Sequence, residues 1–339
     1  LQHRRRRRDP RPEQGVLSGH DDGVDSAAPR LIAAVAAVVL AAGAIWFLSR
    51  GDDGGDTSAP TTVPPTAASS TTWSTSSTTT STTTTSSTTV PPTTAAPVPT
   101  TARPTSGPDG FPDASTTGHL SSDLEPSAGF VVAQDGAVIE GLDVSGKITV
   151  VADDVTIRDS RITTSEDYGI FVDENAVNAR FQDLTIIGTG IECTAGLAPF
   201  GTWTASHLDV SGCEDGVKMH GGQHLEHSYI HDLAVGDTTH NDAVQVTSGK
   251  NSVIHHNNLI APVQNAAIMM SSNFAAVDNW TITNNRFSGG NYTVYVRNQG
   301  YGDPTNVLLA DNTWVTGSWQ YGPYDFDGTG VTMAGNTGF

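Results

Sequence analysis

A short motif recurs nine times between residue 139 and the end of the sequence, and it constrains the fold more than any other feature. It reads apolar, polar, polar, Asn/Asp/Ser, any residue, apolar, and successive copies begin 18 to 29 residues apart. That spacing is the size of one structural unit in a solenoid. The copies are IEGLDV at 139, IRDSRI at 157, FQDLTI at 181, ASHLDV at 205, LEHSYI at 225, IHHNNL at 254, ITNNRF at 282, LADNTW at 309 and MAGNTG at 333.

A second series of short apolar segments lies between these motifs. In each segment the second and fourth residues are apolar while the third varies, which is typical of a strand with one buried face. Parallel stacking of such strands at about 4.8 Å would close a continuous apolar interior. The sequence therefore predicts an all-β solenoid of about nine coils. The segments are GIFV at 169, GIEC at 190, GVKM at 216, AVQV at 243, AIMM at 267 and TVYV at 293.

One column of the repeat is polar, and it supports the alignment independently. A buried Asn at a repeated turn can satisfy its amide by bonding to the coils on either side. This column resembles the asparagine ladder of right-handed parallel β-helices, and residues 118–339 resemble the pectate-lyase-like superfamily in coil pattern. We expect residues 118–132 to form an N-terminal cap, a helix being one form it could take. The column in the last five coils is Ser228, Asn257, Asn285, Asn312 and Asn336.

The residues before the repeat divide into three segments. Residues 1–30 are an Arg-rich tail, and 31–50 contain 18 consecutive apolar residues, Leu31 to Leu48, which predict a transmembrane helix. The Arg bias predicts a single-pass protein of the cell membrane with a cytoplasmic N-terminus and an extracellular β-helix domain. A cleaved signal peptide is the alternative, but no small-residue cleavage site follows. Residues 51–117 are rich in Thr, Ser and Pro and predict a disordered stalk.

The charge of the repeat region restricts its partners. Residues 111–339 hold 27 acidic residues against 8 Lys and Arg, so nucleic acid is excluded as a partner. An acidic glycan could approach only at a local cationic patch. We expect the domain to be a monomer that binds a polysaccharide.

In-register stacking places several ionisable residues on one outer face. Lys218 and His220 share a strand, the next coil brings Asp242 and Gln245 beside them, and His240 lies at the rim of the loop before that coil. We expect Lys218, His220, His240 and Asp242 to form a catalytic set. An isolated exposed Lys is usually only solvated, which is the alternative for Lys218.

The same face continues into the last coils with residues suited to sugars. Tyr292 and Tyr295 can stack on sugar rings, and Arg297 can hold a carboxylate. Together with Gln245 they are the predicted substrate-binding residues. The remaining histidines of this region are expected to be turn or ladder residues: His224, His227, His231, His255 and His256.

Acidic residues near Lys218 raise the question of a metal ion. Glu192 and Asp215, together with Asp242, fall in three successive coils and could offer oxygen ligands to Ca²⁺. Turn capping by the Asp side chains is the alternative reading. Zinc is not expected, because no HxxxH pair falls on a predicted helix and the histidines do not suggest a tetrahedral set of ligands. Cys193 and Cys213 fall on consecutive coils, so an extracellular disulfide is expected, with free thiols as the alternative.

The resemblance implies a polysaccharide lyase that cleaves uronate glycans by β-elimination, or a C5 epimerase. Both reactions remove the proton next to a carboxylate, which needs a base and a cation. Lys218 suits either role, His220 or His240 suits base or acid, and Asp242 would orient a histidine or bind calcium. One alternative is a glycoside hydrolase using Asp215 and Asp242, although the clustered Asp signatures of polygalacturonases are missing. The other is a non-catalytic, adhesive carbohydrate-binding protein.

Overall fold

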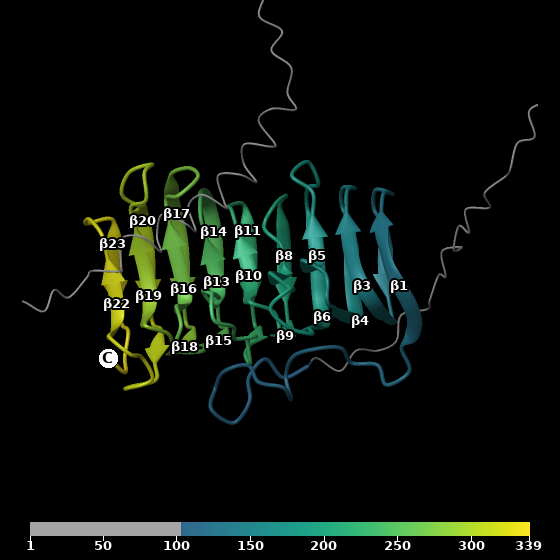
Figure 1. Cartoon of the computed structure of the whole chain (residues 1–339), viewed down its shortest axis with the longest axis horizontal. Helices are drawn as coiled ribbons and strands as arrows, with labels where there is room; N and C mark the ends of the chain where they lie inside the picture. Colours follow the sequence, from purple (N-terminus) through teal and green to yellow (C-terminus); the bar gives the residue numbers. More distant parts are fainter. Residues whose placement is uncertain (1–102) are drawn as a thin grey trace, which may run out of the picture. The chain divides into compact units, whose positions relative to one another are not determined.

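The computed structural model describes residues 103–339, which form a parallel β-solenoid of about eight turns (Figure 1). All strand pairings within these residues are parallel. The predictions for residues 1–30, 31–50 and 51–102 lie outside the described residues. Within 103–339 there is no helix with the length and apolar character of a membrane span.

Three faces run along the solenoid, and each is a ladder of stacked strands. Face 1 contains β1 (Glu125–Val132), β3 (Leu142–Val150), β5 (Tyr168–Val172), β7 (Ala195–Leu197), β10 (Asp215–Met219), β13 (Asp242–Val246), β16 (Ala266–Ser271), β19 (Tyr292–Arg297) and β22 (Gly322–Phe326). Face 2 contains β2 (Val138–Glu140), β4 (Thr156–Thr164), β6 (Ala179–Gly188), β8 (Trp203–Ser206), β11 (Gln223–Glu226), β14 (Gly249–His255), β17 (Val277–Thr283), β20 (Thr305–Ala310) and β23 (Val331–Ala334). Face 3 contains β9 (Asp209–Ser211), β12 (Tyr229–Ile230), β15 (Asn258–Ala261), β18 (Arg286–Gly289) and β21 (Thr313–Trp314), and it is extended by the long strands β1, β3, β4 and β6.

The predicted coil count was too high by about one. All nine motif copies do fall on successive strands of face 2, from β2 to β23. Nine stacked strands enclose only eight complete turns, which agrees with the observed number. The right-handed sense of the helix stays a prediction.

The interior is a continuous apolar column, as the alternating pattern predicts. Val, Ile and Leu from all three faces are fully buried, and large aromatic side chains fill the centre of several coils. Phe287 and Trp314 meet edge to face, with ring centroids 5.0 Å apart. Burial of this surface is the main stabilising term for stacked coils. The largest buried aromatic residues are Trp203, Trp280, Trp314, Phe181 and Phe287.

The predicted asparagine ladder is confirmed at the turn between faces 2 and 3. The backbone N–H of Ser228 donates to Asn257 Oδ1, that of Asn257 to Asn285, that of Asn285 to Asn312, and that of Asn312 to Asn336, each at 2.9 Å. These Asn side chains therefore satisfy buried backbone donors of the preceding coil.

A second column precedes the ladder by one residue, and its backbone is left-handed in all nine motif copies, in seven of them at a non-glycine residue and in two at Gly141 and Gly335. This conformation suits Asn, Asp and His better than bulkier residues. The prediction that His227 and His256 are turn residues is confirmed here. The non-glycine members of the column, with φ from 44° to 55°, are Asp159, Asp183, His207, His227, His256, Asn284 and Asp311.

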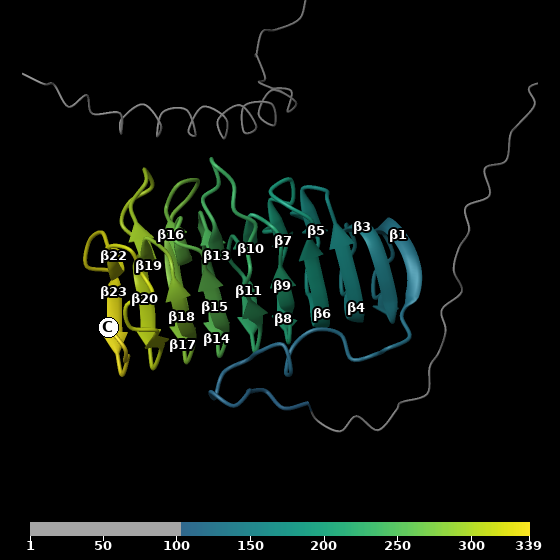
Figure 2. The same ribbon diagram turned by 60° about the horizontal axis from the view of Figure 1, so that its bottom comes forward.

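Residues 103–122 form an irregular segment, here called the strap, that packs along this turn column and runs toward β1 (Figures 1 and 2). The prediction that the linker extends to residue 117 is therefore wrong for residues 103–117. The predicted capping helix is also absent from residues 118–132. Residues 125–132 are instead strand β1, which pairs with β3 and adds a first rung to the solenoid.

Candidate functional site

Face 1 brings together most of the predicted site residues. The register aligns Lys218 with Gln245, Gln245 with Met269, and Met269 with Tyr295. Gly216 and Val217 are both fully buried, and a Cβ on Gly216 would lie 2.3 Å from the Ile230 side chain. Because two consecutive residues occupy the interior, Asp215 and Lys218 reach the same outer side.

Lys218 is held by two partners on this face. Its Nζ lies 2.7 Å from Asp215 Oδ2 and donates to Gln245 Oε1 at 2.9 Å, and only 15% of its side chain is exposed. Burial opposes the charged ammonium, but the adjacent Asp215 carboxylate outweighs it and raises the pKa of Lys218. Lys218 is thus a fixed cation, and it is a poor candidate for a base.

Asp215 and Asp242 lie beneath Lys218 and are 2% and 0% exposed. The backbone N–H of Asp242 donates to Asp215 Oδ1 at 2.8 Å, while Gln245 and Asn265 donate to the two Asp242 oxygens at 3.1 and 2.7 Å. Burial raises the pKa of both carboxyl groups, and at Asp242 the negative charge of Asp215 adds to burial. Both side chains are therefore harder to ionise than an ordinary Asp.

His220 lies at the end of the same strand, beside the ammonium group. Its Nε2 is 3.1 Å from Thr247 Oγ1, and Phe200 meets its ring edge to face at 5.0 Å between centroids. Burial, assisted by the positive charge of Lys218, lowers the pKa of His220 to about 4. The imidazole is therefore neutral at pH 7, and it is a weaker base than an ordinary histidine, while its protonated form is a stronger acid.

His240, from the predicted catalytic set, and Arg297, from the predicted substrate-binding residues, are placed differently from what the sequence predicts. His240 lies on the exposed loop before β13, and no hydrogen bond within residues 103–339 joins its side chain to the Lys218 cluster. Arg297 pairs with Asp327 at 3.1 Å and with Asp325, and it lies 5.3 Å from the Tyr295 ring centroid. Tyr292 and Tyr295 meet edge to face at 5.4 Å, so the aromatic patch is present. Arg297, however, is already engaged by carboxylates.

The register prediction was wrong at one coil, which misplaced Glu192. The segment GIEC at 190 was assigned to face 1, but the strand of this coil is β7, whose Ala195 pairs with Tyr168 and with Asp215. Both stretches alternate apolar residues, so periodicity alone did not separate them. Glu192 is instead exposed in the turn before β7.

The predicted disulfide is confirmed, and it lies in the turn that departs from the repeat. Cys193 and Cys213 are bonded, with Cα atoms 4.7 Å apart. The bond ties the turn before β7 to the turn before β10, next to Asp215. The extra residues of the turn shift the strand of this coil away from GIEC.

The acidic residues do not fit a calcium ion. Within the part of the chain that the structure describes, no three His, Cys, Asp or Glu side chains are arranged to hold a metal. Asp215 already accepts from Lys218 and from the Asp242 backbone, and Glu192 lies in a different turn. Glu192 and Asp215 are thus not placed to share one metal ion.

Three residues that contact the site were not predicted from the sequence. Phe200 follows β7, so the register error hid it, and Asn265 lies in the turn before β16. Thr247 follows β13 as His220 follows β10, so in-register stacking of these two strands was a usable signal. No known protein family, curated protein or solved structure matches this chain.

Proposed function

We propose that face 1 binds an extracellular polysaccharide containing uronate residues and cleaves it by β-elimination. The observation that carries this proposal is a neutral imidazole, His220, beside a fixed ammonium group, Lys218. Removal of a proton next to a carboxylate needs such a base and such a cation together. The resemblance of the coil pattern to pectate-lyase-like proteins is a weaker second support.

The two residues would divide the chemistry between them. His220 takes the C5 proton of the uronate, and Lys218 stabilises the negative charge that develops on the carboxylate. The C4–O bond then breaks to give the unsaturated sugar, and the leaving oxygen receives a proton from the imidazolium or from water. A C5 epimerase would share the first step and return a proton to the opposite side of C5.

Hydrolysis has less support on this face. A glycosidase needs two carboxyl groups that reach the glycosidic bond or its attacking water. Asp215 and Asp242 are both buried below Lys218 and Gln245, so neither reaches a bound polymer without rearrangement.

Non-catalytic carbohydrate binding is the second candidate, and a specific observation favours it. Lys218 and Arg297 both have carboxylate partners within the chain, so neither offers an unshared charge to a uronate. The tyrosines at the C-terminal end of face 1 can stack on sugars without any reaction. This candidate predicts binding without product.

One experiment separates these functions. The full chain is incubated with uronate and neutral polysaccharides, and unsaturated product is followed by ultraviolet absorbance while binding is measured on the same substrates. A lyase yields absorbance that His220→Gln reduces at least 100-fold, with binding retained and His240→Gln unaffected. Binding without absorbance or reducing ends indicates an adhesive protein, and reducing ends without absorbance indicate a hydrolase. Absence of both product and binding refutes the proposal.

A further inference from the structure

Four histidines gather at the turn between faces 2 and 3, away from face 1. His207, His227 and His256 occupy the left-handed position of three successive coils, and His255 precedes the last of them. The rings of His207 and His227 stack at 5.5 Å between centroids, and His227 meets His256 at 5.0 Å. We call these four residues the histidine stack.

The histidine stack contains buried ring nitrogens without hydrogen-bond partners among the described residues. Three ring nitrogens are buried without a hydrogen-bond partner within residues 103–339. They are both nitrogens of His207 and the Nδ1 of His227. His256 Nδ1 faces the Asn284 amide donor at 2.7 Å, and His256 Nε2 faces Ser106 Oγ at 2.8 Å. A charged imidazolium would therefore lose its hydration, and it would be repelled by any other protonated ring in the stack.

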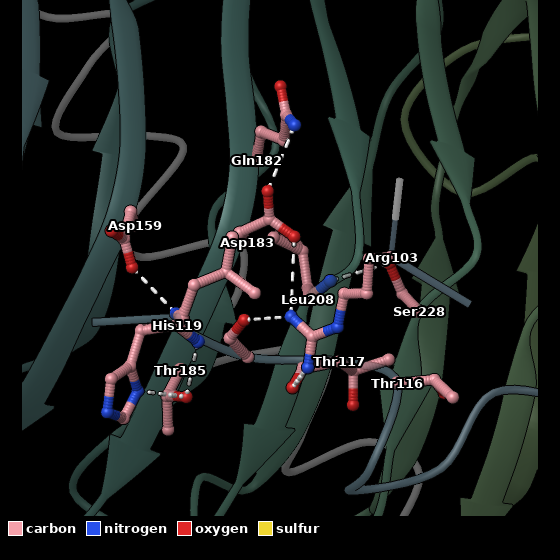
Figure 3. Close-up of polar contacts among 12 residues, drawn as sticks. Arg103, Thr116, Thr117, His119, Asp159, Gln182, Asp183, Thr185, Leu208 and Ser228 are labelled. Atoms are coloured by element: carbon pink, nitrogen blue, oxygen red, sulfur yellow. Dashed lines mark hydrogen bonds and ion pairs between the residues drawn. The ribbon is translucent and has the colours of Figure 1, made fainter. Parts of the chain in front are cut away.

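The strap covers this stack. Phe111 stacks on the His256 ring at 5.9 Å, Ser106 bonds the same ring, and the backbone N–H of Gly118 donates to the His207 carbonyl at 2.9 Å. Arg103 reaches Asp183 at 3.3 Å and also donates to the backbone carbonyl of Thr117 (Figure 3). The strap thus adds burial and one positive charge to the histidines beneath it.

We propose that residues 103–117 of the strap are an acid-released clasp, which neutral histidines hold in place and which their protonation releases. The observation behind it is a stack of imidazoles, three of whose buried nitrogens have no partner within residues 103–339, directly under a segment without regular secondary structure. Release frees about 15 residues, which span roughly 50 Å when extended. Acid would thereby lengthen the chain that leads into the β-helix.

The charges around the stack agree with this direction. Burial lowers the pKa of His207, His227 and His256; Arg103 adds to the effect at His207, and neighbouring histidines add to it at the other two. Glu226 opposes the shift at His207 and His227, Asp183 opposes it at His207, and backbone hydrogen bonds to Thr105 and Asn284 oppose it at His256, but none of them reverses it. Thr283 and Asn284 are neutral contacts of His255 and His256.

The sign of the pH effect follows from these directions. Because the docked state binds fewer protons than free histidine, docking is strongest above the ordinary His pKa of 6.5 and weakens as pH falls through that value.

The C-terminal end of the strap has a different anchor. Asp159 accepts from the backbone N–H groups of Leu120 and Ser121 at 2.6 and 2.8 Å, and it also accepts from the Ser121 hydroxyl. Burial raises the pKa of Asp159, but these hydrogen bonds outweigh burial and lower it. This carboxylate stays ionised at pH 5, so residues 120–121 remain attached while the clasp opens.

Hydrogen exchange of the full chain tests the clasp. We expect protection of peptides from residues 103–117, corrected for intrinsic rates, to fall at least tenfold between pH 7.5 and 5.0, while β14 and β17 stay protected. The variant His207→Asn/His227→Asn/His256→Asn should retain the strap at pH 5.0, because Asn284 already occupies the same left-handed position. His240→Asn is the matched control and should behave as wild type.

Two results would overturn the clasp. One is wild-type protection that does not change down to pH 5.0, and the other is an equal loss in the triple variant. His256→Asn alone is measured as well, in case the triple variant does not dock the strap at pH 7.5. The single variant must move the midpoint of release to lower pH, and an unmoved midpoint counts against the proposal.

Discussion

His220 on face 1 is half-buried and His256 at the turn between faces 2 and 3 is buried, and burial lowers the pKa of each imidazole. Their surroundings differ. His220 lies beside an ammonium group and a hydroxyl on the outer side of a strand ladder, whereas His256 lies in a left-handed turn under the strap. Burial by itself therefore does not identify a reactive histidine. The groups next to it decide whether a proton can be used in chemistry or only disturbs packing.

The largest effect on stability is expected at the ion pair between Lys218 and Asp215, next to His220. Lys218→Met leaves the Asp215 carboxylate buried without its partner and should lower the free energy of unfolding by about 3–5 kcal/mol at pH 7. Asp215→Asn/Lys218→Met should recover most of that loss, since no unpaired charge remains. Urea denaturation measures both variants.

The control for this pair is Lys250→Met, because Lys250 is more exposed and lies 3.9 Å from Asp278. It should change stability by less than about 0.5 kcal/mol. A loss in Lys218→Met as small as in this control would show that Asp215 is not a buried partner.

At the turn between faces 2 and 3, stability should depend on the hydrogen bonds of the asparagine ladder and not on charge. Asn285→Ala removes the acceptor of the Asn257 backbone N–H and the donor to the Ile254 carbonyl. Two buried groups without partners should cost about 2–4 kcal/mol, independent of pH between 6 and 8. Thermal denaturation should show this loss, while Asn175→Ala, on the exposed surface, should leave the transition unchanged.

The ladder and the ion pair also show what the sequence could and could not predict. The Asn column and the coil spacing predicted the fold and placed Lys218, His220 and Asp242 on one face, because stacking in register follows from a strict repeat. Glu192 was misplaced because the disulfide-bonded turn adds residues to one coil. Period-2 alternation carries no information about such an insertion.

Contacts between distant segments could not be predicted from the sequence for a different reason. The strap has no repeat, so nothing linked Ser106 to His256 across about 150 residues. The pairing of Arg297 with Asp325 and Asp327 depends on the adjacent coil, whose face 1 strand does not share the apolar pattern of the earlier ones.

A smaller effect is expected from the turn histidines at neutral pH. His256→Asn should change stability by less than about 1 kcal/mol at pH 7.5, because Asn suits the left-handed backbone. The loss of stability as pH falls below 6.5 should also be smaller in this variant than in the wild type, because one histidine with a lowered pKa is removed. Urea denaturation at pH 7.5 and 5.5 measures both effects, and an unchanged acid loss would contradict the assignment.

The most direct test of the site is the titration of the His220 imidazole, followed by NMR in the intact protein. We expect a midpoint near pH 4, and a higher midpoint in Lys218→Gln, because the neighbouring positive charge is then absent. A midpoint near the ordinary value of 6.5, unchanged by the Lys218 substitution, would mean that these two side chains are not neighbours on one buried face, and the proposed proton transfer would lose its basis.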